Sequence, residues 1–121
     1  VHLDEANEKV TANFTLFFAL HLAVFFGFRI NNEFSEQKNF LDLLEGTFSS
    51  YQPYHPHFLK GREAEVTSDI LKVMQPEELQ QIQLHHEFRR RLLSAYEDYY
   101  RLHIPNFGNM KTLPVLREIA G

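Results

Sequence analysis

The chain has no cysteine and only five glycines among its 121 residues. The lack of cysteine excludes a disulfide framework, a thiolate metal site and a cysteine nucleophile. The glycines form no phosphate-cradling loop, and a Gly-x-Ser-x-Gly elbow is missing. These absences remove several classes of enzyme and metalloprotein, and we expect a chain that is not an enzyme.

A basic excess is missing too, because the net charge is −4 at pH 7. Phosphate contacts supply most of the affinity of a protein that binds nucleic acid on its own, so such a protein usually carries surplus lysine and arginine. Any nucleic-acid role of this chain must therefore depend on a local patch or on another part of the protein.

A hydrophobic run long enough to cross a membrane is also absent. The densest apolar stretch, FTLFFALHLAVFFGF, runs from Phe14 to Phe28 and is interrupted by His21, whereas a transmembrane helix needs about 20 apolar residues. No basic n-region or cleavage site marks it as a secretory signal. A helix that is apolar on every side belongs at the centre of a bundle, and Gly27 suits the residue that ends it. We predict a central buried helix over residues 4–26.

The hydrophobic content of 44%, with twelve phenylalanines, indicates a globular domain. A length of 121 residues suits one domain with a real core. The chain begins at Val1 rather than at methionine and reads as helix from its start. We expect residues 1–121 to be a single helical domain that belongs to a longer protein.

The middle of the chain predicts one small β-hairpin. In FLDLLEGTFSSY, a two-residue turn at 45–46 would pair Leu43 with Phe48 and Phe40 with Tyr51. Leu41, Leu43 and Phe48 would then share one face of the hairpin and cover the helices. One more helical turn that ends at the glycine is an alternative that the pattern leaves open. The next segment, QPYHPHFLKG, contains two prolines and is expected to cross the domain irregularly.

Three helices are expected later in the chain, over residues 62–74, 76–83 and 85–103. The first is indicated by an apolar stripe at helical spacing, made of Val66, Ile70, Val73 and Met74. Pro76 before two glutamates is a start signal for the second. The third carries a longer stripe, made of Phe88, Leu92, Tyr96, Tyr99 and His103.

The segment YYRLHIPNFGNM predicts how the chain ends. Pro105 cannot continue the helix and biases Ile104 away from helical angles. Thr112 is a good N-cap for a last short helix, which must dock onto the rest because a helix of its length is not stable alone. The fold expected from the whole sequence is all-α: a helical bundle around a central buried helix, with one small β-hairpin.

Seven histidines raise the question of a metal site. His55 and His57 lie two residues apart and His85 and His86 are adjacent, but no glutamate stands three residues before any histidine. The spacing of a His-Glu-x-x-His zinc site is therefore missing. His21 lies alone in an apolar helix, where a hydrogen-bonded core histidine is expected. We expect no metal, no cofactor and no catalytic residue.

The run RRRLL at residues 89–93 is the one local concentration of positive charge. Its three arginines spread about 200° around a helix of 3.6 residues per turn, so they cannot all face one ligand. Arg89 flanks the apolar stripe, and a guanidinium beside an apolar groove suits a carboxylate with a hydrophobic neighbour. The candidate partner-binding residues are Arg89, Phe88, Leu92, Leu93, Arg90 and Arg101.

Four stretches resemble one protein family: ALHLAVFFGF, FLDLLEGTF, HPHFL and above all YYRLHIPNFGNMKTLPVLREI. They are similar to the C-terminal helical region of RecO, the bacterial recombination mediator of DNA repair. The resemblance runs from about Asn13 to Ile119, and the lack of cysteines resembles the form found in Bacteroidetes. Some RecO proteins carry a four-cysteine zinc finger before the last helices, and zinc is not expected here because cysteine is absent.

The resemblance implies a cytoplasmic protein of recombinational repair. RecO proteins bind the acidic, phenylalanine-ended tail of single-stranded-DNA-binding protein, cooperate with RecR, help to load RecA onto single strands and anneal strands. Their DNA-binding OB-fold is N-terminal, and nothing in this sequence resembles it. The chain is thus expected to be the protein-interaction and scaffold part, with DNA bound mainly through the missing domain and with no membrane association.

A second class of function also fits the residues. An unrelated helical domain could sense a small molecule in an aromatic-lined pocket, and an aromatic content of 14% is compatible with both classes. A cavity of several hundred Å³ at the centre of the bundle would favour this alternative, because ligand pockets have about that size. A filled core with an arginine-edged surface groove would favour the first class.

The chain alone is expected to bind single-stranded DNA weakly, because its net charge is −4. Each phosphate contact adds to a steep dependence on salt, so whatever affinity exists should be lost at moderate ionic strength. Titration of a labelled homopolymer strand at about 0.15 M salt, the physiological ionic strength, measures this. Submicromolar binding under these conditions would contradict the expectation.

Overall fold

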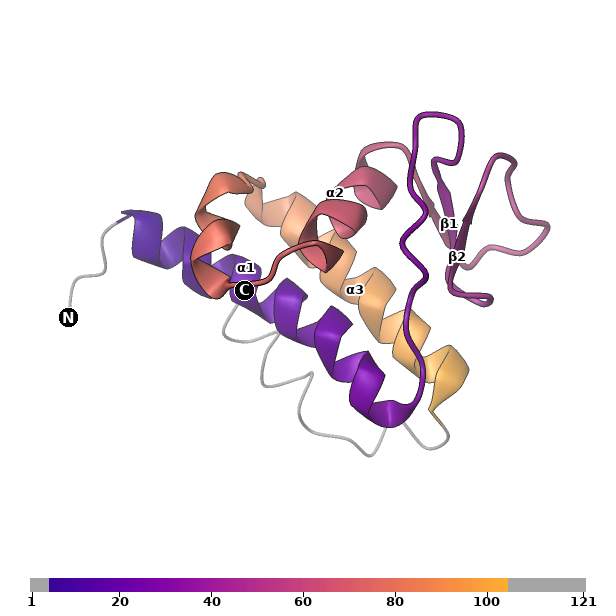
Figure 1. The fold of residues 1–121 in the computed structure, drawn as a ribbon, viewed down its shortest axis with the longest axis horizontal. Helices are drawn as coiled ribbons and strands as arrows, with labels where there is room; N and C mark the ends of the chain where they lie inside the picture. The colour runs from indigo at the N-terminus through magenta and orange to yellow at the C-terminus, as the bar shows by residue number, and fades with distance from the viewer. Residues whose placement is uncertain (1–4, 105–121) are drawn as a thin grey trace.

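The computed structural model describes the backbone of residues 5–104 and the side chains of residues 13–104 other than Pro76. The predicted last helix at Thr112 lies outside these residues. Figure 1 shows the helices gathered together with the sheet to one side of them. In chain order the elements are α1 (Glu5–Leu22), the 3-10 turn η1 (Ala23–Phe26), β1 (Phe40–Asp42), β2 (Thr47–Ser49), β3 (Phe58–Lys60), α2 (Arg62–Leu71), the 3-10 helix η2 (Pro76–Gln81) and α3 (His86–His103).

The structure is mixed α/β, so the prediction of an all-α fold with one hairpin is wrong. Three short strands form an antiparallel sheet in the order β2-β1-β3. The strand that the sequence did not predict is β3, which lies in the segment expected to be irregular. Pro53 and Pro56 precede this strand and do not interrupt it. Three residues are too few to show the alternation of polar and apolar side chains by which a strand is recognised.

The hairpin between β1 and β2 exists, but its register differs from the predicted one. Phe48 pairs with Leu41 and not with Leu43, because the loop comprises the four residues 43–46. The register moves by an even number of residues, so the side chains keep their faces. Leu41 and Phe48 are accordingly 0% and 4% exposed, and the buried face of the sheet is the predicted one.

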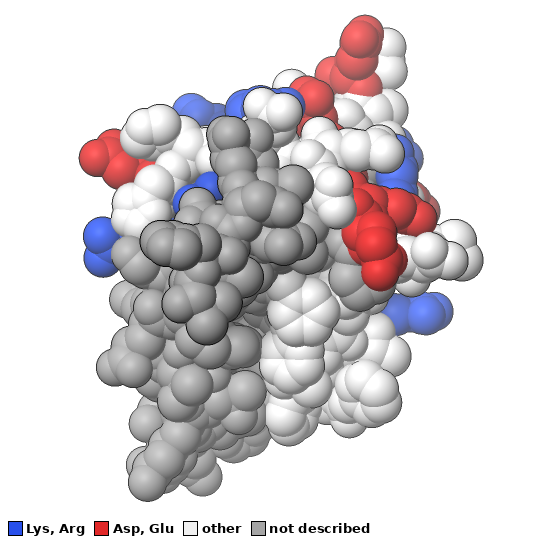
Figure 2. All heavy atoms as spheres, turned by 90° about the vertical axis from the view of Figure 1, so that its left-hand side faces the viewer, with Lys and Arg blue, Asp and Glu red and all other residues white. Residues whose placement is uncertain are grey.

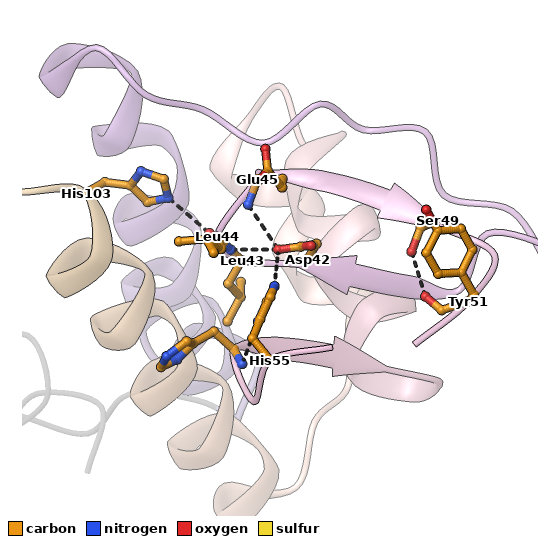
Figure 3. A network of polar contacts seen from close by, with 9 residues as sticks. Asp42, Leu43, Leu44, Glu45, Ser49, Tyr51, His55 and His103 are labelled. Carbon is orange, nitrogen blue, oxygen red and sulfur yellow. Dashed lines mark hydrogen bonds and ion pairs between the residues drawn. The ribbon is translucent and has the colours of Figure 1, made fainter. Parts of the chain in front are cut away.

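The carboxylate of Asp42 determines the length of this loop. Its Oδ1 accepts the backbone N–H of Leu44 at 2.9 Å and that of Glu45 at 3.0 Å, which is the hydrogen bonding by which aspartate stabilises a turn. Figure 3 shows these two bonds converging on one oxygen. Gly46 completes the loop with a φ of 72°, a left-handed conformation that glycine adopts without strain.

The helices match their predicted positions with two differences. α1 and η1 together end at Phe26 as predicted, and Gly27 follows with a φ of 88°. The long helix α3 is also confirmed, whereas the short helix η2 is of the 3-10 type. α2 ends at Leu71, short of the predicted residue 74, and Met74 is consequently 86% exposed instead of joining the apolar stripe.

α1 is buried along one side, whereas its Phe14 is 38% exposed. Leu16 and Ala19 are 1% and 0% exposed, on the side where α1 packs against η2, α3 and α2. Val24 and Phe25, at the end of the same apolar run, are 52% and 85% exposed. None of the helices within residues 5–104 combines the length and the apolar content that a membrane span requires.

Three tyrosines of α3 fill the centre of the domain. Tyr96, Tyr99 and Tyr100 are at most 1% exposed. The hydroxyl of Tyr100 donates to the carbonyl of Ala19 in α1 at 2.5 Å, and the hydroxyls of Tyr96 and Thr67 in α2 lie 2.8 Å apart. The packing of all three helices therefore depends on these buried phenols.

The free energy of unfolding is expected to fall above about pH 10. Burial raises the pKa of Tyr99 from 10.0 to about 12, and burial also raises the pKa of Tyr96 and of Tyr100. In the unfolded chain these phenols ionise near pH 10, so unfolding releases protons between about pH 10 and 12 and stability is lost as the pH rises through this window.

Urea unfolding of wild type and Tyr99→Phe at a series of pH values from about 8 to 11.5 measures this loss. The substitution keeps the ring packing and removes one ionisable group, so the decline should be smaller in the variant. Equal declines in the two proteins would show that ionisation of Tyr99 does not limit alkaline stability.

Candidate functional site

The structure separates most of the predicted partner-binding residues. Leu92 and Leu93 are 0% and 2% exposed and belong to the core, so neither is available to a ligand. Arg90 points to solvent. Arg101 is exposed and pairs with Asp98, with 2.8 Å between Nη1 and Oδ1.

Arg89 lines a surface hollow of about 280 Å³, which we call the Arg89 pocket. Phe88, its neighbour in the sequence, is not part of the lining. Its side chain is half-buried against the core, and the guanidinium of Arg91 lies 5.6 Å from the centre of its ring. The described residues that line the pocket are Asn13, Ile82, Gln83, Leu84, His85 and Arg89.

The Arg89 pocket lies where the connection from η2 meets the first turn of α3. His85 is the N-cap of α3, and its Nδ1 accepts the N–H of Glu87 at 3.3 Å. The Nη1 of Arg89 donates to the carbonyl of Leu84 at 2.8 Å. The guanidinium is thus held beside the start of an 18-residue helix, where free backbone N–H groups and the helix dipole add positive potential.

Asn13 brings α1 into the lining of the same pocket. Its side chain is 1% exposed, and Nδ2 donates to the carbonyl of Leu79 at 3.2 Å and to that of Ile82 at 2.6 Å. These two acceptors fix which end of the amide is nitrogen. In the part of the chain that the structure describes, the Oδ1 of Asn13 and the Nε of Arg89 are buried and have no hydrogen-bond partner.

Local charge and not overall charge makes this pocket suitable for an anion. The chain carries a net charge of −4, and Figure 2 shows positive and negative side chains interspersed over the described part of one face. Arg89 and the start of α3 act together over a few ångströms, which is within the Debye length of about 8 Å at physiological salt. A short anionic group is therefore a better ligand than an extended polyanion.

A larger hollow of about 560 Å³ lies between α2 and η2. Asp69 and Glu78 line it together with Lys72. Because charges of both signs share this lining, it selects neither anions nor cations. The Arg89 pocket is the more specific of the two.

Two histidines beside the sheet, His55 before β3 and His103 in α3, serve as hydrogen-bonding groups. The Nε2 of His55 donates to Asp42 Oδ1 at 3.0 Å, while its Nδ1 accepts the backbone N–H of His57 at 3.0 Å. The Nε2 of His103 lies 3.0 Å from the carbonyl of Leu43, as Figure 3 shows. Among the side chains that the structure describes, within residues 13–104, no three histidine, aspartate or glutamate residues come together in a group that could hold a metal ion.

Sequence reasoning found Arg89 but missed the other polar residues of its pocket. Asn13 makes its hydrogen bonds to backbone 66 and 69 residues away, a distance that no periodicity reveals. A polar amide at the start of a long apolar run was the available signal. His85 was predicted near the start of a helix, but its N-cap role depends on the extended backbone of the preceding connection.

The structure is a small α/β domain with a surface pocket that is lined, among the described residues, by one arginine, Arg89, and by the buried amide of Asn13. No protein-family model matches the chain, and no solved structure gives a significant match. Curated relatives do match. The DNA repair protein RecO of Phocaeicola vulgatus is 36% identical over 97% of this chain and 48% of its own length. RecO of Azobacteroides pseudotrichonymphae is 30% identical over 93% of this chain, and RecO of Bacteroides fragilis is 32% identical over 89%.

These matches confirm the resemblance to RecO. They extend over nearly the whole chain, and not over one motif alone. The chain spans about half the length of the curated relatives it matches, since it covers 45–48% of each. The sequence is therefore RecO-like, and it corresponds to part of a RecO protein.

Folding is expected to require no metal ion. The sequence offers no thiolate ligand, and both ring nitrogens of His55 and the Nε2 of His103 already make hydrogen bonds. Thermal melting with and without an excess of chelator should give the same midpoint. A midpoint lowered by many degrees, and restored by added zinc, would show that histidines hold a structural metal.

Proposed function

We propose that this chain is the protein-interaction and scaffold part of a RecO-like recombination mediator in DNA repair. The observation that carries the proposal is the match of 89–97% of the chain, at 30–36% identity, to proteins named DNA repair protein RecO. A C-terminal position in the parent protein, an N-terminal OB-fold outside this chain and a cytoplasmic location are parts of the same proposal.

In this role the chain binds other proteins and makes or breaks no covalent bond. RecR is one partner, and the complex helps RecA to load onto single strands and helps strands to anneal. Contact with DNA runs mainly through the OB-fold. The net charge of −4 supports this division of labour, because a DNA-binding surface would need positive charge.

We assign the Arg89 pocket to the acidic, phenylalanine-ended tail of single-stranded-DNA-binding protein. Arg89 provides a cation for the terminal carboxylate. Ile82 and Leu84 are half-buried and supply apolar surface for the ring. The volume of about 280 Å³ lies just below the range of about 300–1,000 Å³ for ligand pockets, which suits one terminal residue better than a cofactor.

The packing of the core gives less support to a small-molecule sensor. Such a domain would hold its ligand among the aromatic side chains at its centre. Tyr96, Tyr99 and Tyr100 occupy that position. Tyr96 bonds to Thr67 and Tyr100 to Ala19, and the ring of Phe28 packs on Tyr99 and Tyr100, with 5.1 Å between the ring centres of Phe28 and Tyr99. The aromatic residues thus serve the core.

Replacing Arg89 by Ala should weaken binding of the tail peptide by about 1.5–3 kcal/mol, the range for hydrogen bonds to charged groups. The reason is the loss of the only arginine in the described lining of the pocket. Titration of a labelled acidic peptide ending in phenylalanine into wild type and variant measures the change.

Arg90→Ala is the matched control, because Arg90 is the next residue of the same helix and is exposed. It removes the same charge from outside the lining, so its effect should be within a few tenths of a kcal/mol, as for most exposed charges. Melting curves of both variants show whether the bond from Arg89 to Leu84 matters for folding. Equal weakening by the two substitutions would point to general electrostatics and away from the pocket.

A further inference from the structure

The Arg89 pocket holds two unsatisfied polar atoms of opposite character. The Nε of Arg89 is a hydrogen-bond donor and the Oδ1 of Asn13 is an acceptor, and neither has a partner in the part of the chain that the structure describes. Both residues line the same hollow. Buried polar groups are normally paired, and leaving one unpaired costs about 1–3 kcal/mol.

The acceptor cannot be exchanged for a donor by turning the amide over. The Nδ2 of Asn13 is already used by the carbonyls of Leu79 and Ile82, at 3.2 and 2.6 Å. A flipped amide would set its oxygen against two carbonyl oxygens. The pocket therefore offers one fixed neutral acceptor together with a cation.

We propose that Asn13 accepts the N–H of the last peptide unit of the bound chain while Arg89 binds its carboxylate. This inference rests on the proposed function, because it states which atoms of a peptide end the pocket reads. In a C-terminal residue, the backbone N–H and the carboxylate are attached to the same Cα, so both lie within reach of one small pocket. A simple anion such as acetate satisfies the guanidinium and leaves Asn13 unpaired.

The charge of the donor also matters. A free amino acid offers an ammonium group in place of the amide N–H. The guanidinium of Arg89 and the start of α3 repel a second cation at this place, and an ammonium loses more hydration than an amide when it is buried. The pocket thus favours the end of a peptide over a free amino acid.

The two unsatisfied atoms lie beneath the surface, so the chain end must displace side chains to reach them. Gln83 and His85 are the exposed members of the lining. Rotation of either side chain costs little, because neither is packed in the core. The hydrogen bond that the His85 side chain accepts from the N–H of Glu87 is long, at 3.3 Å, and would be broken by such a movement.

The experiment compares two peptides on the wild-type protein. One is an acidic peptide that ends in phenylalanine, and the other is its ester analogue, in which oxygen replaces the last backbone N–H. The ester keeps the carboxylate, the ring and the overall shape, and lacks only the donor. We expect the ester to bind at least 10-fold more weakly, and free phenylalanine to bind more weakly still.

Asn13→Ala provides the matching test on the protein side. In this variant the amide and ester peptides should bind equally, because the acceptor is gone. The variant also loses both bonds to the η2 connection, and if it does not fold, the comparison on wild type decides alone.

The outcomes separate this inference from the proposed function. Equal binding of amide and ester by wild type overturns the role of Asn13 and leaves Arg89 and the carboxylate in place. Binding of free phenylalanine as tight as that of the peptide also overturns it. No binding of either peptide overturns the proposed function itself.

Discussion

The arrangement of the three helices depends on two buried tyrosine hydroxyls, each of which needs a hydrogen-bond partner. Tyr96 and Tyr100 lie in the centre of the domain, where an unpaired hydroxyl would cost about 1–3 kcal/mol. One acceptor comes from the backbone of α1, at Ala19, and the partner of Tyr96 comes from α2, at Thr67. These bonds specify both the position and the rotation of α3 against its two neighbours, which apolar contacts alone would leave less defined.

The pocket follows from this arrangement of helices. When α3 is placed against α1, its first turn comes close to the part of α1 that carries Asn13, and the η2 connection must pass between them. Asn13 holds that connection through two carbonyls, and Arg89 holds its end through Leu84. Asn13, a polar residue within an apolar run, thus has a structural role through its amide nitrogen, while its amide oxygen has no partner among the described residues.

The sequence predicted the helices well and the sheet poorly, for a physical reason that individual residues show. The long stripe of α3 extends over about four turns at 3.6 residues per turn, and the tyrosines in it are buried as expected. β3 has three residues, and only Leu59 among them is buried. Its pairing with β1 is a contact between distant segments, which leaves no periodic signal. The same limit applies to the site, where Arg89 was visible as a local charge beside an apolar stripe and Asn13 was not.

The register of the hairpin shows how one side chain overrides a turn preference. Glu45-Gly46 suits a tight turn, but the carboxylate of Asp42 bonds to two N–H groups of the loop and lengthens it. Buried Leu41 and Phe48 were still assigned to the correct face, since the shift is even. Face assignment is more robust than pairing because it depends only on the parity of positions.

One oxygen atom of Asp42 joins two loops that are separate in the sequence. It accepts hydrogen bonds from the hairpin loop at Leu44 and Glu45 and from the crossing segment at His55. A substitution in one loop therefore affects the hydrogen bonding of the other. The changes in the free energy of unfolding caused by substitutions at Asp42 and His55 will not be additive, because the two side chains are in contact. For evolution this means that the two loops change together: a lineage that replaces the aspartate loses the hairpin cap and the anchor of the crossing segment in a single step.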